Sequence, residues 1–222
     1  MGVNSFLDLD LSEQRLGAIE ALGWTVPTPI QAEAIPPGLA GTDGVGIAQT
    51  GTGKTGAFMI PALERLRSGG GLQVLALCPT RELAQQVADD TASLAMGTNI
   101  RTAAIFGGVG YGPQIEALES GFEVIVATPG RFIDHAHSKR VDLSNVNCLV
   151  LDEADRMLDM GFIDDIQFIL DLTPDERNTS LWSATMPPEI MRLAETNMNM
   201  PKRILVDSDE LSCDGIHQSF LV

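Results

Sequence analysis

The sequence predicts an α/β fold, with a mostly parallel sheet covered by helices on both faces. Seven short apolar runs alternate with longer segments of helical periodicity, which is the order expected of strand–helix–strand units. Several runs are apolar without alternation, as in strands that are buried on both sides. A chain of 222 residues is long enough to bury such a core as one large domain.

Each predicted element follows from one of these patterns. Short apolar runs indicate strands, at 45–49, 73–78, 102–106, 123–128, 147–153, 179–185 and 202–206. Longer segments of helical periodicity indicate helices, at 12–22, 31–38, 55–67, 81–94, 113–119, 130–137, 162–171 and 187–197. The stretch SGGG (68–71) is predicted to be a loop.

Six polar or glycine-rich stretches follow the ends of predicted strands. They are AQTGTGKT (48–55), PTREL (79–83), GG (107–108), TPGR (128–131), DEAD (152–155) and SAT (183–185). In a parallel sheet the carboxyl ends of the strands meet at one edge, and ligands bind beyond that edge. We therefore expect all six stretches to lie along the same edge.

Composition narrows the class of protein. A formal net charge of −16 argues against a broad basic surface for gripping nucleic acid. Three cysteines without CxxC spacing suggest neither zinc nor disulfides, and Cys78 and Cys148 are expected in the core. His135 and His137 are expected to be solvated rather than metal ligands. No signal peptide and no apolar stretch near the roughly 20 residues of a membrane span occur, so a cytoplasmic setting is expected.

The stretch AQTGTGKT is close to the phosphate-binding pattern of Gly, four residues and Gly-Lys-Ser/Thr, but Ala48 replaces the first glycine. Gly51 and Gly53 would let backbone N–H groups turn toward phosphate oxygens, and the following helix adds its positive dipole end. Lys54 can reach the outer phosphates, and the Thr55 hydroxyl can coordinate Mg²⁺. Taken alone, the stretch could also be a glycine-rich turn without a ligand.

An apolar run ending in Asp152 and Glu153 indicates the second half of a nucleotide site. Asp152 can hold Mg²⁺ through water, and Glu153 can polarise the attacking water as a general base. Two carboxylates at a helix start could otherwise be a plain N-terminal cap. A cap does not explain why the loop, the strand and the carboxylates occur in this order.

The chain resembles the first RecA-like domain of the DEAD-box ATP-dependent RNA helicases over essentially its whole length. The resemblance rests on the six stretches above, on Phe6 upstream of GWTVPTPIQ (23–31), and on RMLDMGF after DEAD. The loop of that family reads A-x-T-G-x-G-K-T, so Ala48 is normal for it. The resemblance implies a three-layer RecA-like P-loop NTPase fold, with the ATP-binding domain at 1–207, its adenine-recognition segment at 4–32, and the start of a linker at 208–222.

The resemblance also implies which residues bind ATP and Mg²⁺. The glutamine matching Gln31 reads adenine, because an amide offers a donor and an acceptor to the base edge. Aromatic residues matching Phe6 and Trp24 pack around the base, and core packing is an open alternative for both. The implied nucleotide-binding residues are Phe6, Trp24, Thr28, Gln31, Ala48, Gln49, Thr50, Gly51, Thr52, Gly53, Lys54 and Thr55. Catalysis is assigned to Lys54, Asp152 and Glu153, and the metal ligands are Thr55 and Asp152.

A second implied set contacts the RNA backbone, a contact that carries no base sequence. This set comprises Pro79, Thr80, Arg81, Glu82, Gly108, Thr128, Pro129, Gly130 and Arg131. Arg81 and Arg131 either add charge or brace the loops. A narrow track of N–H groups, hydroxyls and few arginines can hold RNA on an acidic protein, though weakly and with strong salt sensitivity. The coupling of ATP state to RNA separation is assigned to Asp155, Ser183, Ala184 and Thr185, although SAT could also be a strand end before a helix cap.

The family works with two RecA-like domains, and nothing here resembles the H-R-x-G-R-x-x-R segment of the second. We therefore expect RNA helicase activity only when the second RecA-like domain is joined, and an isolated chain that is nearly inactive. Two other functions stay open, an ATP-gated RNA clamp or scaffold with little unwinding and a DNA-directed helicase of the same superfamily. No membrane partner is expected.

Overall fold

The computed structural model describes residues 3–205, so the predicted linker at 208–222 lies outside the described residues. Within this range one sheet has the strand order β3-β4-β2-β5-β6-β1-β7, and every pairing is parallel. Its strands are β1 (Gly44–Ile47), β2 (Val74–Leu77), β3 (Thr102–Ile105), β4 (Val124–Ala127), β5 (Cys148–Leu151), β6 (Asn178–Ser183) and β7 (Lys202–Leu205). All seven predicted strands are present, and the described sheet is wholly parallel.

Helices follow most strands and return the chain to the start of the next strand. The structure has a short 3₁₀ helix, η1 (Phe6–Asp8), and the α-helices α1 (Glu13–Ala21), α2 (Pro29–Leu39), α3 (Lys54–Glu64), α4 (Arg81–Leu94), α5 (Tyr111–Ser120), α6 (Pro129–His137), α7 (Ala154–Asp159), α8 (Ile163–Leu172) and α9 (Pro188–Asn197). The eight predicted helices are confirmed. The prediction omitted α7, because six residues are too few to establish a periodic pattern.

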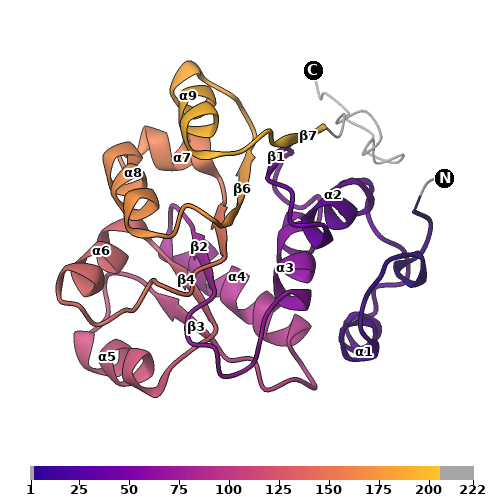
Figure 1. The fold of residues 1–222 in the computed structure, drawn as a ribbon, viewed down its shortest axis with the longest axis horizontal. Coiled ribbons are helices and arrows are strands. Elements are labelled where there is room, and N and C mark those ends of the chain that lie inside the picture. Colours follow the sequence, from indigo (N-terminus) through magenta and orange to yellow (C-terminus); the bar gives the residue numbers. More distant parts are fainter. Residues whose placement is uncertain (1–2, 206–222) are drawn as a thin grey trace, which may run out of the picture.

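Two hydrophobic cores lie on opposite faces of the sheet. Along β2, Val74 and Ala76 belong to the core beneath α2, α3 and α4, whereas Leu75 and Leu77 belong to the core beneath α6, α8 and α9. This alternation follows from the two-residue period of a strand. Figure 1 shows the resulting three layers, with the two groups of helices on either side of the strands.

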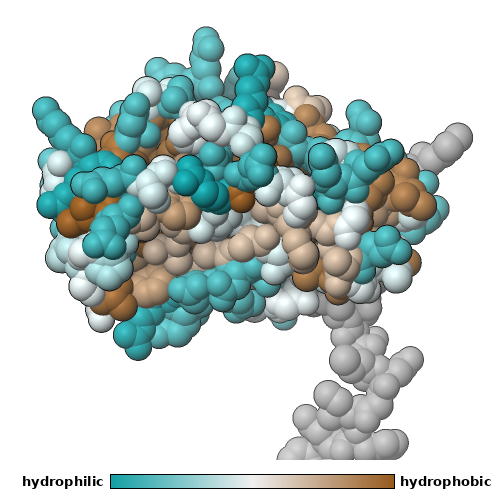
Figure 2. Space-filling view, turned by 90° about the horizontal axis from the view of Figure 1, so that it is seen from below, coloured by the Kyte–Doolittle hydropathy of each residue, from teal (hydrophilic) through white to brown (hydrophobic). Residues whose placement is uncertain are grey.

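The cysteines are buried and the surface is largely hydrophilic. Cys78 and Cys148 are buried free thiols in the core, as predicted. Figure 2 shows a face on which hydrophilic residues predominate and apolar residues form smaller areas between them. Among residues 3–205, no helix combines the length and the apolar character that crossing a bilayer requires.

Candidate functional site

All six polar stretches begin where a parallel strand ends, so they share one edge of the sheet. The strand order divides them into two neighbouring groups. AQTGTGKT, SAT and DEAD follow β1, β6 and β5, which are adjacent, and PTREL, TPGR and GG follow β2, β4 and β3, which are also adjacent. The predicted nucleotide residues and the predicted RNA residues therefore occupy two halves of one edge, which meet between β5 and β2.

The loop between β1 and α3 has the backbone that a phosphate-binding turn requires. Gly51 and Gly53 have φ angles of 85° and 92°, in the left-handed region that favours glycine. Ala48 is buried, and its N–H donates to the Ser183 carbonyl, which fixes the start of the loop beside β6. Because α3 begins at Lys54, its free N–H groups face this edge, where an anion would be stabilised.

Lys54 and Asp152 form a buried ion pair between this loop and the end of β5. The distance from Lys54 Nζ to Asp152 Oδ1 is 3.7 Å, and the two side chains are only 7% and 4% exposed. Burial raises the pKa of Asp152 to about 6, while Lys54 opposes the shift and Glu153 adds to it. At neutral pH Asp152 is thus a buried carboxylate that needs a nearby cation.

The donor set around Asp152 fits a magnesium ion. Asp152 Oδ1 is buried without a hydrogen-bond partner, because 3.7 Å to Lys54 is longer than a hydrogen bond. No cluster of three or more His, Cys, Asp or Glu side chains is found within residues 3–205. Mg²⁺ usually takes one or two carboxylates and completes its shell with phosphates and water, so a single carboxylate and the Thr55 hydroxyl suit it.

Glu153 occupies an unusual backbone position directly after Asp152. Its φ and ψ of 53° and 51° lie in the left-handed region, and it is the N-cap of α7. Its carboxylate lies 3.2 Å from Arg156 Nη1. A hollow of about 230 Å³ joins this pair to Thr50 and Lys54 of the phosphate loop.

Asp155 links the DEAD stretch to the SAT stretch by three hydrogen bonds. Its carboxylate accepts from the Thr185 N–H at 2.9 Å and from the Thr185 hydroxyl at 2.8 Å. Its own N–H donates to Ser183 Oγ at 3.1 Å. The hydrogen bonds from Thr185 and Ser183 lower the pKa of Asp155 against the effect of its burial. Ala184 is exposed between the two partners and lines the 230 Å³ hollow.

Gln31 joins α2 to the phosphate loop. Its amide N–H donates to the Gly53 carbonyl at 3.1 Å, and its amide oxygen accepts from the Thr28 N–H at 3.0 Å. Contact with α3 is so close that a Cβ on Gly56 would lie 2.6 Å from Gln31 Nε2 and 2.8 Å from the Trp24 ring. An amide has two donors and two lone pairs, so these two hydrogen bonds use half of the capacity of Gln31, which is a buried side chain.

Phe6 and Trp24 stack on each other near Gln31. Their ring centroids are 6.4 Å apart, and their planes are inclined by 26°. Phe6 is 3% exposed and belongs to the core, whereas Trp24 is half-buried. Phe6 is thus placed to support Trp24, and Trp24 keeps surface for a ligand.

The predicted RNA residues are placed at two helix N-termini and one glycine turn. Thr80 caps α4 by accepting from the Leu83 N–H, and Arg81 and Glu82 form an exposed ion pair with each other. Pro79 and Pro129 are buried, while Thr128 and Gly130 are partly exposed at the start of α6. Gly108 has a φ of 84° and packs beside the Arg81 guanidinium.

Arg131 braces two loops. Its Nη1 donates to the Val109 carbonyl at 3.0 Å, and its guanidinium lies 4.1 Å from the centre of the Tyr111 ring. Tyr111 in turn donates to Asp134, which lies on the same helix as Arg131. Because the Arg131 side chain is only 11% exposed, bracing is the alternative that the geometry favours over a free phosphate ligand.

The prediction for His135 is wrong, because this residue is fully buried between α5 and α6. Its Nε2 lies 3.3 Å from the Gln114 amide oxygen, and the Gln114 amide N–H donates to the Phe106 carbonyl. His137 is exposed, as predicted, and packs edge-on against Phe168. The spacing of the two histidines does not reveal this difference, because it depends on which face of α6 meets α5.

A pH dependence of stability follows from the burial of His135. Burial lowers the pKa of this imidazole, as do Arg140 and Arg131 against the opposing effect of Asp134. A base whose pKa is depressed by folding takes up a proton more readily in the unfolded chain, so its contribution to stability is lost as pH falls below about 6.5.

We expect His135→Gln to remove this part of the acid sensitivity. Melting temperatures measured from pH 7.5 to 5 should fall more steeply for the wild-type chain than for His135→Gln. The exposed His137→Gln variant is the matched control and should follow the wild-type curve. Parallel curves for all three proteins would contradict the expectation.

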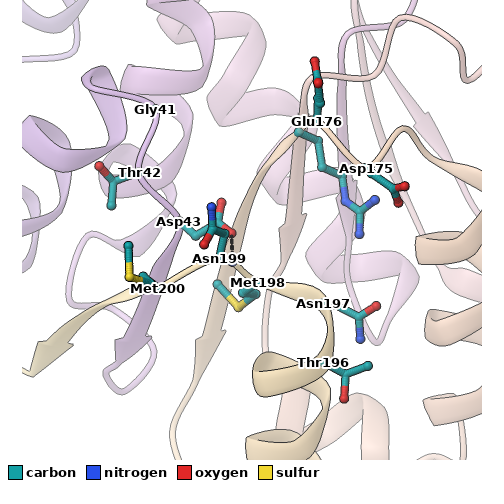
Figure 3. Close-up of a pocket in the computed structure, with 11 residues that line it drawn as sticks. Gly41, Thr42, Asp43, Asp175, Glu176, Thr196, Asn197, Met198, Asn199 and Met200 are labelled. Carbon is teal, nitrogen blue, oxygen red and sulfur yellow. Dashed lines mark hydrogen bonds between the residues drawn. The ribbon is translucent and has the colours of Figure 1, made fainter.

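A second hollow, of about 660 Å³, lies away from these stretches. It is bounded by the segments that precede β1, β6 and β7, which places it at the opposite edge of the sheet (Figure 3). The Asp43 carboxylate accepts from the N–H groups of Thr179 and Asn199 at 2.7 Å and from the Asn178 amide at 3.3 Å. This carboxylate therefore connects the segments at the start of β1, β6 and β7, and both of its oxygens accept hydrogen bonds from the protein itself.

Three residues near the site were absent from the predicted set. Arg156 pairs with Glu153, and Tyr111 and Asp134 hold Arg131. The three-residue spacing of Glu153 and Arg156 on a helix is a pattern that could have indicated their pairing. Tyr111 and Asp134 are 23 residues apart, and the sequence offers no local pattern that connects them.

Comparison with known proteins places the chain among helicases. The family model described as DEAD/DEAH box helicase matches residues 28–193. A DEAD-box ATP-dependent RNA helicase of Bacillus subtilis, CshA, is 44% identical over 218 residues, which cover 98% of this chain and 44% of that protein. The chain thus spans less than half the length of this curated relative.

Two solved structures share the fold. The crystal structure of a DEAD box protein from the hyperthermophile Methanococcus jannaschii matches with a TM-score of 0.91 and 41% identity, over 95% of this chain and 58% of that chain. That of a hypothetical ATP-dependent RNA helicase from Sulfolobus tokodaii matches with a TM-score of 0.83 and 37% identity, over 88% and 57%. These matches confirm the predicted three-layer RecA-like fold.

Proposed function

The chain belongs to the DEAD/DEAH box helicase family, and from this premise we propose that it is the ATP- and RNA-binding half of an ATP-dependent RNA helicase. The observation that supports this most strongly is the buried Lys54–Asp152 pair beside a glycine turn at the start of α3. A buried carboxylate facing a lysine at a helix N-terminus suits a triphosphate with its cation.

In the proposed site, each residue has a task that its geometry permits. Trp24 stacks on adenine, and Gln31 reads the base edge with the donor and the acceptor that its internal hydrogen bonds leave over. N–H groups of residues 50–54 bind the phosphates, and Lys54 moves from Asp152 toward the outer phosphate. Thr55 and Asp152 would hold Mg²⁺, which neutralises the charge that develops on the phosphates.

Glu153 is proposed to orient the attacking water and accept its proton. The two acids have different partners, because Glu153 pairs with Arg156 whereas Asp152 lies beside Lys54, and we assign them different roles. Arg156 Nη1, 3.2 Å from the Glu153 carboxylate, restricts the orientation of this side chain. Hydrolysis by water attack needs this orientation more than it needs a strong base.

The proposed RNA track is the other half of the same edge. Helix α6 and the glycine turn at 107–108 offer N–H groups to phosphates, and Thr80 and Arg81 lie at the N-terminus of α4 beside that turn. Asp155 is proposed to couple the nucleotide site to SAT. Its hydrogen bonds join α7 to Ser183 and Thr185, so a shift of α7 would move these two residues. We place the domain at 1–207 and its adenine-recognition segment at 4–32.

The proposal is tested at Gln31, whose role in base reading is the most specific part of it. We expect Gln31→Ala to lower the ratio of ATP affinity to GTP affinity about three- to tenfold, the worth of one lost hydrogen bond. Isothermal titration calorimetry with both nucleotides measures the ratio. Gln86→Ala, at an exposed position on α4, is the control.

Titration with inorganic tripolyphosphate separates base reading from bracing of the loop. A Gln31→Ala variant that binds tripolyphosphate normally but loses preference for ATP supports base reading. An unchanged ATP-to-GTP ratio would contradict it, and a wild-type chain that binds no ATP would contradict the proposed function as a whole.

A further inference from the structure

Arg15 is a buried, charged residue between Phe6 and Trp24, the two aromatic residues of this segment that the proposed nucleotide site uses. It lies on α1 and is 2% exposed. Its Nε is 3.3 Å from Glu64 Oε1, at the last residue of α3, and its Nη1 donates to the carbonyl of Leu94, the last residue of α4. One guanidinium therefore ties α1 to the ends of two helices, of which α3 begins with the phosphate loop.

Glu64 strengthens this connection by holding α1 at a second point. Its Oε1 accepts from the Ser12 hydroxyl at 2.9 Å, and Ser12 is the N-cap of α1 through its bond with the Arg15 N–H. Burial lowers the pKa of Arg15, and the Glu64 charge opposes this shift. A buried guanidinium is tolerated only with such partners, so the cluster is specific to one placement of α1.

The position of α1 affects the two stacked aromatic rings, because this helix lies between Phe6 and Trp24 in the chain. Phe6 lies before α1 in the chain, and Trp24 lies three residues after its last residue, Ala21. Ala18 and Ile19 of α1 are buried and Leu16 packs partly against the same core, and Arg15 is the charged residue among the buried residues of this helix. The Trp24 ring also lies in contact distance of a Cβ placed on Gly56, so a small movement of α1 would change how the ring sits on α3.

We propose that Arg15 is a positioning residue for adenine recognition: by fixing α1 on α3 and α4, it holds Trp24, supported by Phe6, in the position in which Trp24 stacks on the base. The inference rests on the proposed function, because it presumes that a nucleotide base lies against Trp24. Arg15 itself touches no ligand in this scheme. Its effect is confined to the base, since the phosphates are held by the loop before α3.

The experiment compares ATP, GTP and inorganic tripolyphosphate binding to the 222-residue chain by isothermal titration calorimetry. In Arg15→Met we expect the ATP affinity to fall about tenfold, the lower part of the range for one stacked base, with tripolyphosphate affinity unchanged. Arg15→Lys keeps the charge beside Glu64 and should restore most of the loss. Arg192→Met, which removes an exposed arginine on α9, is the matched control and should bind all three ligands as wild type does.

Each outcome decides the inference. The inference is supported if Arg15→Met lowers the affinity for nucleotides but not for tripolyphosphate, and if Arg15→Lys restores the nucleotide affinity. Equal losses for ATP and tripolyphosphate, or a lower melting temperature with unchanged affinities, would mean that Arg15 serves stability alone and would overturn it. If Arg15→Met does not fold, Glu64→Gln makes the same test, because it keeps the shape of the pair and removes one charge. A wild-type chain that binds no ATP would overturn the proposed function and this inference together, whereas normal wild-type binding with an unaffected variant overturns only the inference.

Discussion

Lys54→Ala is expected to abolish the thermal stabilisation that ATP and Mg²⁺ give to this chain. A ligand present at about 100 times its Kd stabilises the folded state by about 2.7 kcal/mol, which for a domain of this size is a rise in Tm of roughly 5–10 °C. Lys54 is the cation at the start of α3, and Asp152 is the carboxylate 3.7 Å from it. Without the ammonium group, the outer phosphates lose the cation proposed to bind them directly, so the attraction between this site and the triphosphate is lost.

The measurement is a pair of melting curves for each protein, with and without nucleotide. Taking the difference within each protein removes any change in intrinsic stability, which is needed because Lys54 also lowers the pKa of Asp152. Lys202→Ala, at an exposed position on β7, removes the same charge far from the loop and should keep the full shift. If Lys54→Ala also keeps the full shift, nucleotide binds elsewhere.

The positions of the strands were predictable from the sequence because β2, β4 and β5 are short, buried apolar runs, and the six polar stretches could be placed because each follows a predicted strand. The order of the strands was not predictable. The composition of a strand does not encode its position in a parallel sheet, and nothing in the chain indicates that β6 lies between β5 and β1. That order is what places SAT beside both the phosphate loop and DEAD, and so brings Thr185 to Asp155.

Other omissions arise from tertiary contacts that a helical pattern does not encode. His135 and His137 have the same local sequence context, yet one is buried against α5 and the other is exposed. Arg15 lies among polar residues in the sequence and pairs with Glu64, which is 49 positions further along the chain. Arg131 was predicted with two alternatives, and only its contacts with Val109 and Tyr111 distinguish them.

The chain alone is expected to hydrolyse ATP slowly, and the second RecA-like domain is expected to raise the rate by about 10³–10⁵-fold. An arginine that reaches the γ-phosphate in the transition state has an effect of this size. Among the described residues that line the 230 Å³ hollow, Arg156 is the arginine, and its guanidinium is engaged by Glu153 at 3.2 Å. Because Arg156 is paired with the proposed water-orienting carboxylate, we expect the charge that stabilises the transferring phosphoryl group to come from the second RecA-like domain.

Phosphate release, measured with and without single-stranded RNA, tests this expectation on the chain and on a protein that joins it to a second RecA-like domain. Lys54→Ala in both proteins gives the background from contaminating ATPases. A chain that alone reaches the rate of the two-domain protein would contradict the expectation, and Arg156→Ala then identifies the cause. Loss of that rate in Arg156→Ala would show that this arginine is needed within the chain, either at Glu153 or at the phosphates.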